Sequence, residues 1–182
     1  KQLVVSGDSN AVGSPNQTAN PWPKRVTTTL GWNTESNGST VGYKLSQAAA
    51  SVTAGGRNDW LAAQPIVFAL GTNDLAVDHA SLATMQGYVN TLIANFAGSR
   101  YPMFFATIPA SDSITGADET TRTDWNAWLP GVAGITVMGF AAALGGPPSW
   151  TNFEGDPLHL NNAGHDVCED TAVAAFQTAG YA

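Results

Sequence analysis

The sequence contains 182 residues, of which 43% are hydrophobic and only 12% are charged. Seven basic residues against 14 acidic ones give a formal net charge of −7, and no basic run occurs, which argues against a nucleic-acid or anionic-membrane partner bound through positive charge. No stretch of about eighteen consecutive apolar residues is present, so we expect no membrane insertion. The length predicts one domain over residues 1–182, with room for a well-buried core.

The start of the chain and its single cysteine bear on the compartment of the protein. The chain begins at Lys1, almost inside its first apolar run, and has no initiator methionine. We therefore expect either a mature secreted protein that acts outside the cell or a domain excised from a larger protein. Cys168 has no second cysteine with which to form an internal disulfide. Because it falls on a predicted helix, we interpret it as a buried apolar residue rather than a reactive thiol.

Five short runs predict strands, and their apolar residues follow one another without alternation. In chain order the runs cover residues 3–6, 30–34, 65–70, 103–108 and 135–138. The run at 30–34 is weaker than the others. Continuous apolar strands are typical of a parallel sheet that is covered on both faces.

Helix-like stretches alternate with these strands, over about 40–52, 81–96, 119–129 and 162–178. In the second stretch apolar residues recur at helical spacing, which indicates a core-facing side rather than a cofactor site. The alternation predicts an α/β sandwich with right-handed crossovers, in which ligands bind beyond the carboxyl ends of the strands. The segment 13–24, rich in Pro, Asn and Ser, is expected to form a loop over that edge.

The first predicted strand ends in the turn Gly7-Asp8-Ser9-Asn10. These are ordinary turn residues, so a polar loop is the simplest interpretation. The alternative is that Ser9 is a nucleophile presented at the carboxyl end of a buried strand. The turns after the second and third strands would lie at the same edge, including Gly-Thr-Asn-Asp at 71–74.

A serine nucleophile needs a base to take its proton, and that base works best when a third group orients it. Of the three histidines, His159 lies in a Gly- and Pro-containing loop before the last helix, with Asp156 three residues earlier. This spacing allows the carboxylate to hold Nδ1–H and leaves Nε2 for a serine. We interpret His165 as a packing or capping residue of the last helix and His79 as a surface residue.

An acyl-transfer site also needs hydrogen-bond donors aimed at the oxyanion. Candidates are the backbone amide of Ser9, a glycine amide and the side-chain amide of Asn73. Gly38 follows the second strand at the same edge, and without a side chain it would allow a substrate carbonyl to approach the backbone. Taken singly, Asn73 is more simply a turn residue and Gly38 part of a helix N-terminal turn.

Taken together, these blocks resemble the SGNH (GDSL-type) hydrolase family. The order is Gly-Asp-Ser near the amino end, a glycine block, Gly-Thr-Asn-Asp after the third strand and Asp-x-x-His before the last helix, and it spans residues 3–159. The resemblance implies a three-layer α/β/α sandwich with a central five-stranded parallel sheet of the flavodoxin-like type. It also implies ester hydrolysis without a metal or cofactor.

The resemblance assigns roles to five residues. It implies that Ser9 is the nucleophile, that Asp156 and His159 complete the triad, and that Gly38 and Asn73 form the oxyanion hole with the Ser9 amide. The position of Gly38 rests on its alignment between Asn33 and Thr40. One departure is Asn10, which stands where many members carry Leu or another apolar residue.

The family resemblance leaves the ester open, because its members act on lipids, thioesters, aryl esters and acetylated sugars. The sequence contains six tryptophans. Trp22 and Trp150 fall in predicted loops where an indole could stack on a sugar ring, whereas Trp125 and Trp128 fall on a predicted helix and are interpreted as packing residues. No long apolar lid is visible. We therefore expect a carbohydrate O-acetylesterase that acts on a small-molecule or polysaccharide ester.

Two alternatives remain open. One is a general short-chain esterase or lysophospholipase, which would use the same site. The other is a glycan-binding domain of a larger surface or virion protein that has lost turnover. The complete set of catalytic residue types argues against the second alternative, because a binding domain does not need all of them.

Overall fold

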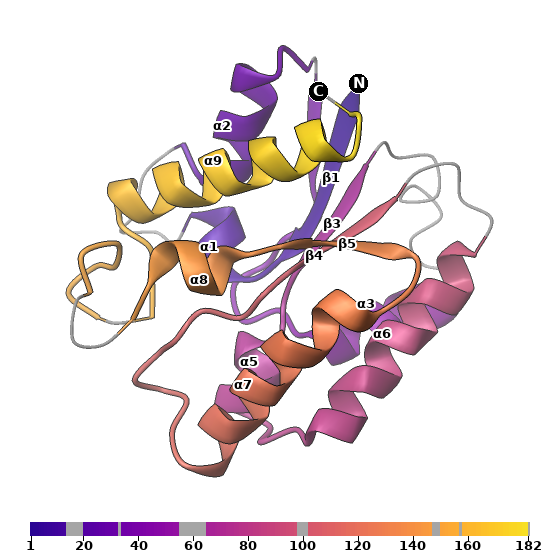
Figure 1. The fold of residues 1–182 in the computed structure, drawn as a ribbon, viewed down its shortest axis with the longest axis vertical. Helices are drawn as coiled ribbons and strands as arrows, with labels where there is room; N and C mark the ends of the chain where they lie inside the picture. The colour runs from indigo at the N-terminus through magenta and orange to yellow at the C-terminus, as the bar shows by residue number, and fades with distance from the viewer. Residues whose placement is uncertain are drawn as a thin grey trace.

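A computed structural model describes residues 1–13, 20–32, 34–54, 65–97, 102–146, 150–156 and 158–181. Within them a five-stranded sheet has the order β2-β1-β3-β4-β5, and every neighbouring pair is parallel (Figure 1). The strands are β1 (Gln2–Gly7), β2 (Thr34–Asn37), β3 (Ile66–Ala69), β4 (Met103–Ala106) and β5 (Ile135–Met138). The predicted five-stranded parallel sheet of flavodoxin-like order is therefore present.

The strand order places a topological switch point between β1 and β3. From β1 the chain first adds β2 on one side, and then continues through β3, β4 and β5 on the other. In open α/β sheets the crevice at such a point, beyond the carboxyl ends of the strands, is where ligands bind. The turns that leave β1 and β3 contain Ser9 and Asn73.

Helices cover both faces of the sheet (Figure 1). One layer contains α3 (Leu45–Thr53), α6 (Leu82–Phe96) and α7 (Ala117–Trp128), which continues into the short 3-10 helix η1 (Leu129–Gly131). The opposite layer contains α2 (Trp22–Thr29), α8 (Phe140–Leu144) and α9 (Asn162–Thr178). Two short helices, α1 (Ser9–Val12) and α5 (Thr72–Ala76), begin directly after β1 and β3.

The sheet separates two apolar cores, because successive side chains of a strand point to opposite faces. Phe104 packs under α9, where its ring lies 4.7 Å from that of Phe176. The next residue, Phe105, packs on the other face and stacks on Phe68 at 4.9 Å. Both faces of the strands are thus buried, which explains why their sequences are apolar without alternation.

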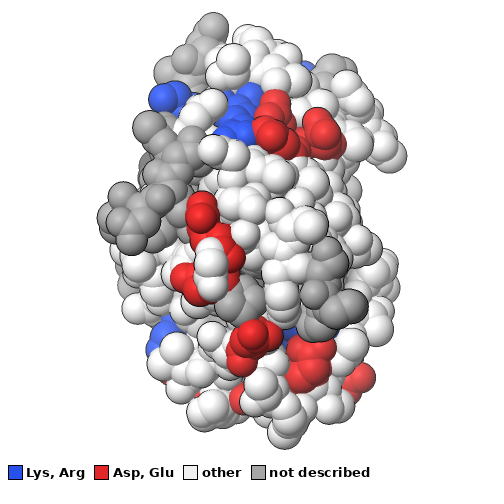
Figure 2. Space-filling model, turned by 90° about the vertical axis from the view of Figure 1, so that its left-hand side faces the viewer, with Lys and Arg blue, Asp and Glu red and all other residues white. Residues whose placement is uncertain are grey.

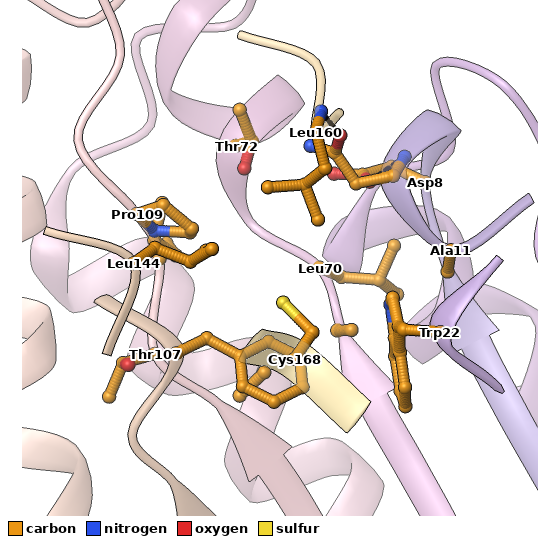
Figure 3. Close-up of a pocket in the computed structure, with 15 residues that line it drawn as sticks. Asp8, Ala11, Trp22, Leu70, Thr72, Thr107, Pro109, Leu144, Leu160 and Cys168 are labelled. Atoms are coloured by element: carbon orange, nitrogen blue, oxygen red, sulfur yellow. Dashed lines mark hydrogen bonds between the residues drawn. The ribbon is translucent and has the colours of Figure 1, made fainter. Parts of the chain in front are cut away.

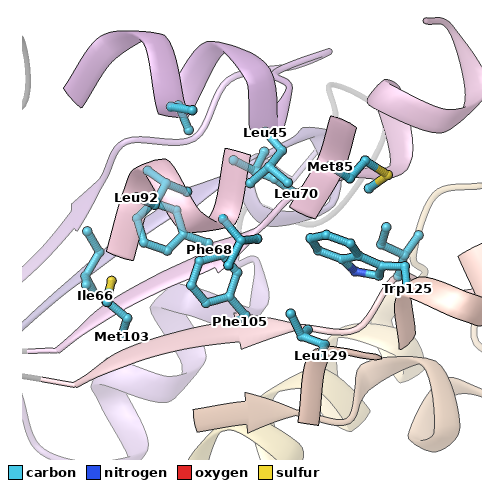
Figure 4. Packing of buried hydrophobic residues seen from close by; sticks show 14 of the residues in the cluster. Leu45, Ile66, Phe68, Leu70, Met85, Leu92, Met103, Phe105, Trp125 and Leu129 are labelled. Atoms are coloured by element: carbon cyan, nitrogen blue, oxygen red, sulfur yellow. The ribbon is translucent and has the colours of Figure 1, made fainter. Parts of the chain in front are cut away.

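The core under α3, α6 and α7 contains the side chains that the helical spacing indicated. Met85, Val89, Leu92 and Phe96 of α6 are all buried. Figure 4 shows Phe68 and Phe105 at the centre of this core, with Trp125 reaching in from α7. Burying each such large side chain stabilises the fold by about 1.5–3 kcal/mol.

The structure corrects the prediction of the second strand. Leu30, the expected start of that strand, instead ends α2, and β2 begins at Thr34. The sequence of β2 is the polar run Thr-Glu-Ser-Asn, and an edge strand tolerates such a sequence because it pairs on one side only.

The expectation of a loop over 13–24 is wrong at its end, and residues 14–19 lie outside the described residues. Helix α2 begins at Trp22 with Pro23 next to it, since proline fits the first turn of a helix, where its missing N–H has no partner. Trp22 is 1% exposed and meets Phe140 edge-on, so it is a core residue and is removed from the candidate sugar-stacking residues. Among the described helices, none is both long and apolar enough to cross a bilayer.

Candidate active site

The turn after β1 presents Ser9 at the start of a helix. The side chain of Asp8 caps α1 by accepting a hydrogen bond from the backbone N–H of Asn10 at 3.0 Å. Ser9 is the first residue of α1, so its N–H belongs to the helix-starting groups that have no acceptor within the helix. Its side chain is largely buried but still reaches the surface, at 8% exposure. The turn is tight: a Cβ on Gly7 would lie 2.4 Å from the Cβ of Ala11.

The loop between α8 and α9 carries the predicted base. His159 Nε2 lies 3.1 Å from Ser9 Oγ, and His159 Nδ1 lies 2.9 Å from Asp156 Oδ2. Because Nδ1–H donates to the carboxylate, the neutral ring presents a lone pair at Nε2 to accept the serine proton. The structure therefore joins Ser9, His159 and Asp156 in one hydrogen-bonded chain, in the order that the sequence predicts.

The surroundings of Asp156 keep its carboxyl group ionised, which the hydrogen bond to His159 Nδ1 requires. Its Oδ1 accepts the backbone N–H of His159 at 2.8 Å and that of Leu158 at 3.3 Å. Burial raises the pKa of this carboxyl, but the hydrogen bonds and charge of His159 outweigh that effect and hold the pKa below its ordinary value. Asp156 is therefore ionised at neutral pH, and the 55% exposure of its side chain to water favours the same charged form.

The turn after β3 brings Asn73 to the same edge of the sheet. Asn73 lies in α5, and its Nδ2 donates to the carbonyl of Tyr43 at 3.2 Å. A side-chain amide has two N–H groups, so one orients the side chain and a second remains as a donor. The neighbouring Asp74 is a structural residue: its buried carboxylate accepts the N–H groups that begin α3, from Leu45 at 2.7 Å and Ser46 at 3.0 Å.

The geometry at Gly38 differs from the expectation. The Gly38 N–H donates to the carbonyl of Val5 at 2.8 Å, and that of Thr40 donates to the carbonyl of Gly7 at 3.0 Å. The ladder between β2 and β1 thus continues past the end of β2 and uses the Gly38 amide. We therefore remove Gly38 from the oxyanion donors, which leaves the Ser9 amide and the Asn73 side chain.

Comparison with known proteins shows the family to which the chain belongs. A model of the GDSL-like lipase/acylhydrolase family matches residues 5–167 of the chain. The chain belongs to this family. It is accordingly a serine ester hydrolase. No protein with a curated description matches the sequence.

Several solved structures have the same fold at low sequence identity. TesA superposes with a TM-score of 0.77 at 15% identity, over 98% of this chain and 99% of that one. The psychrotrophic esterase EstA from Pseudoalteromonas sp., in a structure inhibited by monoethylphosphonate, gives 0.74 at 14% identity, over 100% and 99%. A carbohydrate esterase family 3 protein from Talaromyces cellulolyticus gives 0.69 at 16% identity, over 98% and 97%. These likenesses concern the fold.

The other two histidines are placed away from the Ser9–His159 pair, as the sequence indicates for this GDSL-family chain. His165 is fully buried in α9, where its Nδ1 accepts the backbone N–H of Trp22 at 3.4 Å. Burial lowers its pKa to about 4, so the ring stays neutral. His79 is exposed, and its Nδ1 lies 2.7 Å from a carboxylate oxygen of Asp118.

A small cavity lies behind the turn that carries Ser9. It measures about 30 Å³, about the space of one water molecule. Figure 3 shows Asp8 and Leu160 on one side, Pro109 and Leu144 on the other, and the sulfur of Cys168 pointing between them. Burial raises the pKa of the Cys168 thiol, so this cysteine is not a competing nucleophile.

A much larger cleft opens between the segment that follows β4, the start of α7 and the loop between α8 and α9. It measures about 370 Å³ and is lined by Ala110, Ser111, Asp112, Ile114, Thr115, Gly116, Glu119 and Trp150. Trp150 packs edge-on against Phe153, which bridges to Leu160 next to His159. The cleft combines one indole with hydroxyl and carboxylate groups.

The face onto which the strands point is acidic. Figure 2 shows carboxylates gathered over the middle and lower parts of this face and few basic side chains among them. Exposed or partly exposed acidic residues here include Asp112, Glu154 and Asp156 of the loops and Glu119 in the first turn of α7. Such a surface attracts neutral or cationic molecules more readily than anionic ones.

Sequence reasoning missed two residues of this region. Asp8 is 4% exposed, and burial raises its pKa to about 6 against the opposing effects of the Asn10 N–H and the His159 charge. Asn10 contacts the loop of His159, which lies 149 positions away along the chain. Both roles depend on contacts between distant segments, and the turn residues themselves carry no signal of them.

Proposed function

We propose that Ser9, His159 and Asp156 are the catalytic triad of an esterase that removes short acyl groups, above all acetyl, from carbohydrates outside the cell. The observation that carries the proposal is the 3.1 Å contact between His159 Nε2 and Ser9 Oγ, with Asp156 on the far side of the ring. A glycan-binding domain without turnover would have no use for a base aligned on a serine hydroxyl.

The reaction proceeds in two acyl transfers. Ser9 Oγ attacks the ester carbonyl while His159 Nε2 takes its proton, and Asp156 stabilises the resulting imidazolium. The tetrahedral oxyanion accepts hydrogen bonds from the Ser9 amide and the Asn73 side chain. Collapse breaks the bond to the leaving oxygen, which takes the proton from His159. A water molecule then loses a proton to His159 and attacks the acyl-serine. The bond between the acyl carbon and Ser9 Oγ breaks, His159 returns the proton to Oγ, and the acid is released.

The preference for a polar leaving group rests on the large cleft. Trp150 offers an indole face, and Ser111, Thr115 and Asp112 offer hydroxyl and carboxylate oxygens for the hydroxyl groups of a sugar. The acidic surface disfavours the phosphate-bearing leaving groups of lysophospholipids and coenzyme A thioesters. These features favour a neutral acetylated sugar over the lipid alternative.

The test compares initial rates on 4-nitrophenyl acetate, butyrate and octanoate. We expect wild type to prefer acetate, and Ser9→Ala to lose activity to background because no nucleophile remains. Ser46→Ala is the matched control, since Ser46 lies on α3 and its contact with Asp74 is made by its backbone N–H, which the substitution keeps. Equal rates for wild type and Ser9→Ala on every ester would overturn the proposal, and a preference for octanoate would overturn its substrate class.

Acetate release from acetylated xylo-oligosaccharides tests the proposal that the cleft around Trp150 binds a sugar leaving group. Trp150→Ala is expected to raise KM for the oligosaccharide several-fold, because the stacking surface is lost, while leaving 4-nitrophenyl acetate hydrolysis nearly unchanged. An equal effect on both substrates would show that Trp150 supports the fold rather than sugar binding. If no acetate is released from any acetylated sugar, the carbohydrate assignment is rejected and a general short-chain esterase is the function that agrees with the data.

A further inference from the structure

We propose that Asn10 is a positioning residue that holds His159 against Ser9 by fastening the histidine loop to the nucleophile helix. The inference rests on the proposed function of Ser9 and His159 and deepens it. Asn10 follows Ser9 directly in α1, and its side chain bonds to the residues on either side of His159.

The contact is a pair of hydrogen bonds with opposite sense. Asn10 Nδ2 donates to the carbonyl of Leu158 at 3.1 Å, and the backbone N–H of Leu160 donates to Asn10 Oδ1 at 2.9 Å. A primary amide presents one donor and one acceptor side by side, as a peptide group does, so it can pair with the loop backbone as a neighbouring strand would. The residue between these two contacts is His159.

Much of the histidine loop is held by contacts within the loop, and its Phe153 and Leu160 side chains are also buried in the core that α1 reaches through Ala11. Phe153 and Leu160 form an antiparallel bridge, and the Glu154 N–H donates to the carbonyl of His159 at 2.8 Å. Asp156, which orients the imidazole, belongs to the same loop. These contacts set the direction of the ring within the loop, whereas Ser9 lies on a separate segment, α1. The Asn10 amide joins the two parts.

The backbone of Asn10 is also held in place. Its backbone N–H is held by the buried carboxylate of Asp8, which caps α1. The nucleophile and the clamp are therefore consecutive residues of one short capped helix, and a movement of the loop relative to Ser9 must break two hydrogen bonds. Because a displacement of about 1 Å can cost a factor of about 10² in rate, such a clamp has a catalytic consequence.

The experiment measures kcat and KM on 4-nitrophenyl acetate for Asn10→Leu and Asn10→Asp. Leu has a similar volume and makes neither hydrogen bond, so we expect kcat to fall about 10–100-fold with little change in KM. Asp retains the oxygen that accepts from Leu160 and loses the donor to Leu158, so we expect an intermediate fall. Wild-type kcat in both variants would overturn the inference. If Asn10→Leu does not fold, the kcat of Asn10→Asp decides alone: a fall supports the inference and a wild-type value overturns it.

Asn126→Leu is the matched control. The Asn126 side chain also pairs with a loop backbone, accepting the Ile108 N–H and donating to the Ile108 carbonyl, both at 2.8 Å. Its loss is expected to lower the melting temperature about as much as Asn10→Leu does, without the fall in kcat. Equal falls in kcat for the two variants would show a general loss of stability and would overturn the positioning role.

A double-mutant cycle separates positioning from folding. If Asn10 acts through His159, Asn10→Leu lowers kcat/KM in wild type but not in the His159→Ala background, where no base is left to position. Additive losses would contradict the inference. Full activity of Ser9→Ala and His159→Ala would instead refute the proposed function, so the two failures are distinguishable.

Discussion

Some residues of the candidate site would take part in the reaction, and others orient the reacting side chains. Asp156 orients His159, because its carboxylate contacts both the imidazole ring and the backbone N–H of His159. This double contact sets the tautomer of the ring and its direction, so that Nε2 faces Ser9. The carboxylate is more than half exposed, so solvent weakens its charge effect and the directional effect dominates.

We predict that Asp156→Asn lowers kcat on 4-nitrophenyl acetate by about 10²–10⁴-fold. The amide can still accept the backbone N–H groups of Leu158 and His159, so the loop keeps its shape. An amide nitrogen facing Nδ1, however, favours the wrong tautomer. Steady-state kinetics at pH 8 checks this, and Asp170→Asn on the exposed side of α9 is the control. Wild-type kcat in Asp156→Asn would exclude the orienting role.

Asp8 predicts a pH effect on stability. Its folded-state pKa is about 6, above the ordinary 3.8, so the folded protein binds more protons than the unfolded chain between these values. The free energy of unfolding contributed by Asp8 therefore decreases as the pH rises from about 4 to 6. Asp8→Asn removes the ionisation and keeps the oxygen that caps Asn10.

We expect Asp8→Asn to gain stability relative to wild type over this range and to keep the gain at pH 7. Urea unfolding at pH 4.5, 5.5 and 7 measures the difference between the two proteins. His165, whose pKa is about 4, titrates in the same range, but it is present in both proteins and its effect cancels in the difference. A difference that does not change with pH would contradict the burial of an ionising Asp8.

At the scale of elements, the strand-to-helix turns do most of the positioning. The turn from β1 to α1 is so tight that Gly7 has no room for a side chain. The turn from β3 to α5 is tied to the start of α3 through Asp74 and through the contact of Asn73 with Tyr43. The candidate donors and the nucleophile are thereby fixed to the ends of adjacent strands.

We predict that Gly7→Ala destabilises the protein by about 1–3 kcal/mol, because the added Cβ would lie 2.4 Å from that of Ala11 and 3.0 Å from Ser39 Oγ. Activity should fall as well, since α1 must shift and carries Ser9. Gly87→Ala in α6 meets nothing within 4 Å and is expected to stabilise by about 0.5–1 kcal/mol. Thermal unfolding ranks the three proteins, and equal melting temperatures for Gly7→Ala and wild type would contradict the packing.

The elements also show how far the sequence alone leads. Strands such as β3 and β4 and the helix α6 were predictable, because a core that covers both faces of a sheet demands continuous apolar strands and helical apolar spacing. The edge strand β2 was not, since its polar Thr-Glu-Ser-Asn sequence carries no apolar pattern. The start of α2 was missed because its prolines were interpreted as loop residues.

The candidate site was predictable to a similar extent and for a related reason. Ser9, Asp156 and His159 stand at spacings that a family match and local chemistry both indicate, and the structure brings them together. The Gly38 N–H donates to the Val5 carbonyl because the hydrogen bonding between β2 and β1 continues past the end of β2. No local sequence pattern shows how far that pairing extends. The clamp by Asn10 joins segments at opposite ends of the chain and required the fold.

At the scale of the whole molecule, we expect surface charge to influence which esters reach the site. The chain carries a net charge of −7, and carboxylates gather over the middle and lower parts of the face onto which the strands point. Neutral esters should reach the site more easily than anionic ones, and salt should reduce the difference because the screening length falls from about 10 Å at 0.1 M to about 3 Å at 1 M.

We predict that an aryl acetate with a sulfonate on its leaving group has a lower kcat/KM than 4-nitrophenyl acetate at low ionic strength. As sodium chloride increases to 1 M, the kcat/KM of the sulfonated ester should rise relative to that of 4-nitrophenyl acetate, because salt screens the repulsion. Rates across the salt series measure it, with the uncatalysed hydrolysis of each ester as the control. A ratio independent of salt would show that the surface charge does not act on the substrate.

In the proposed mechanism Ser9, activated by His159, forms a covalent acyl-enzyme. The most direct test of this step is acid quenching of the enzyme during turnover of 4-nitrophenyl acetate, followed by mass spectrometry of the intact chain and of its peptides. We expect a mass gain of one acetyl group on the peptide that contains Ser9, its absence in Ser9→Ala and its slower formation in His159→Ala. Acetylation of another residue, or undiminished turnover in Ser9→Ala, would show that Ser9 is not the nucleophile.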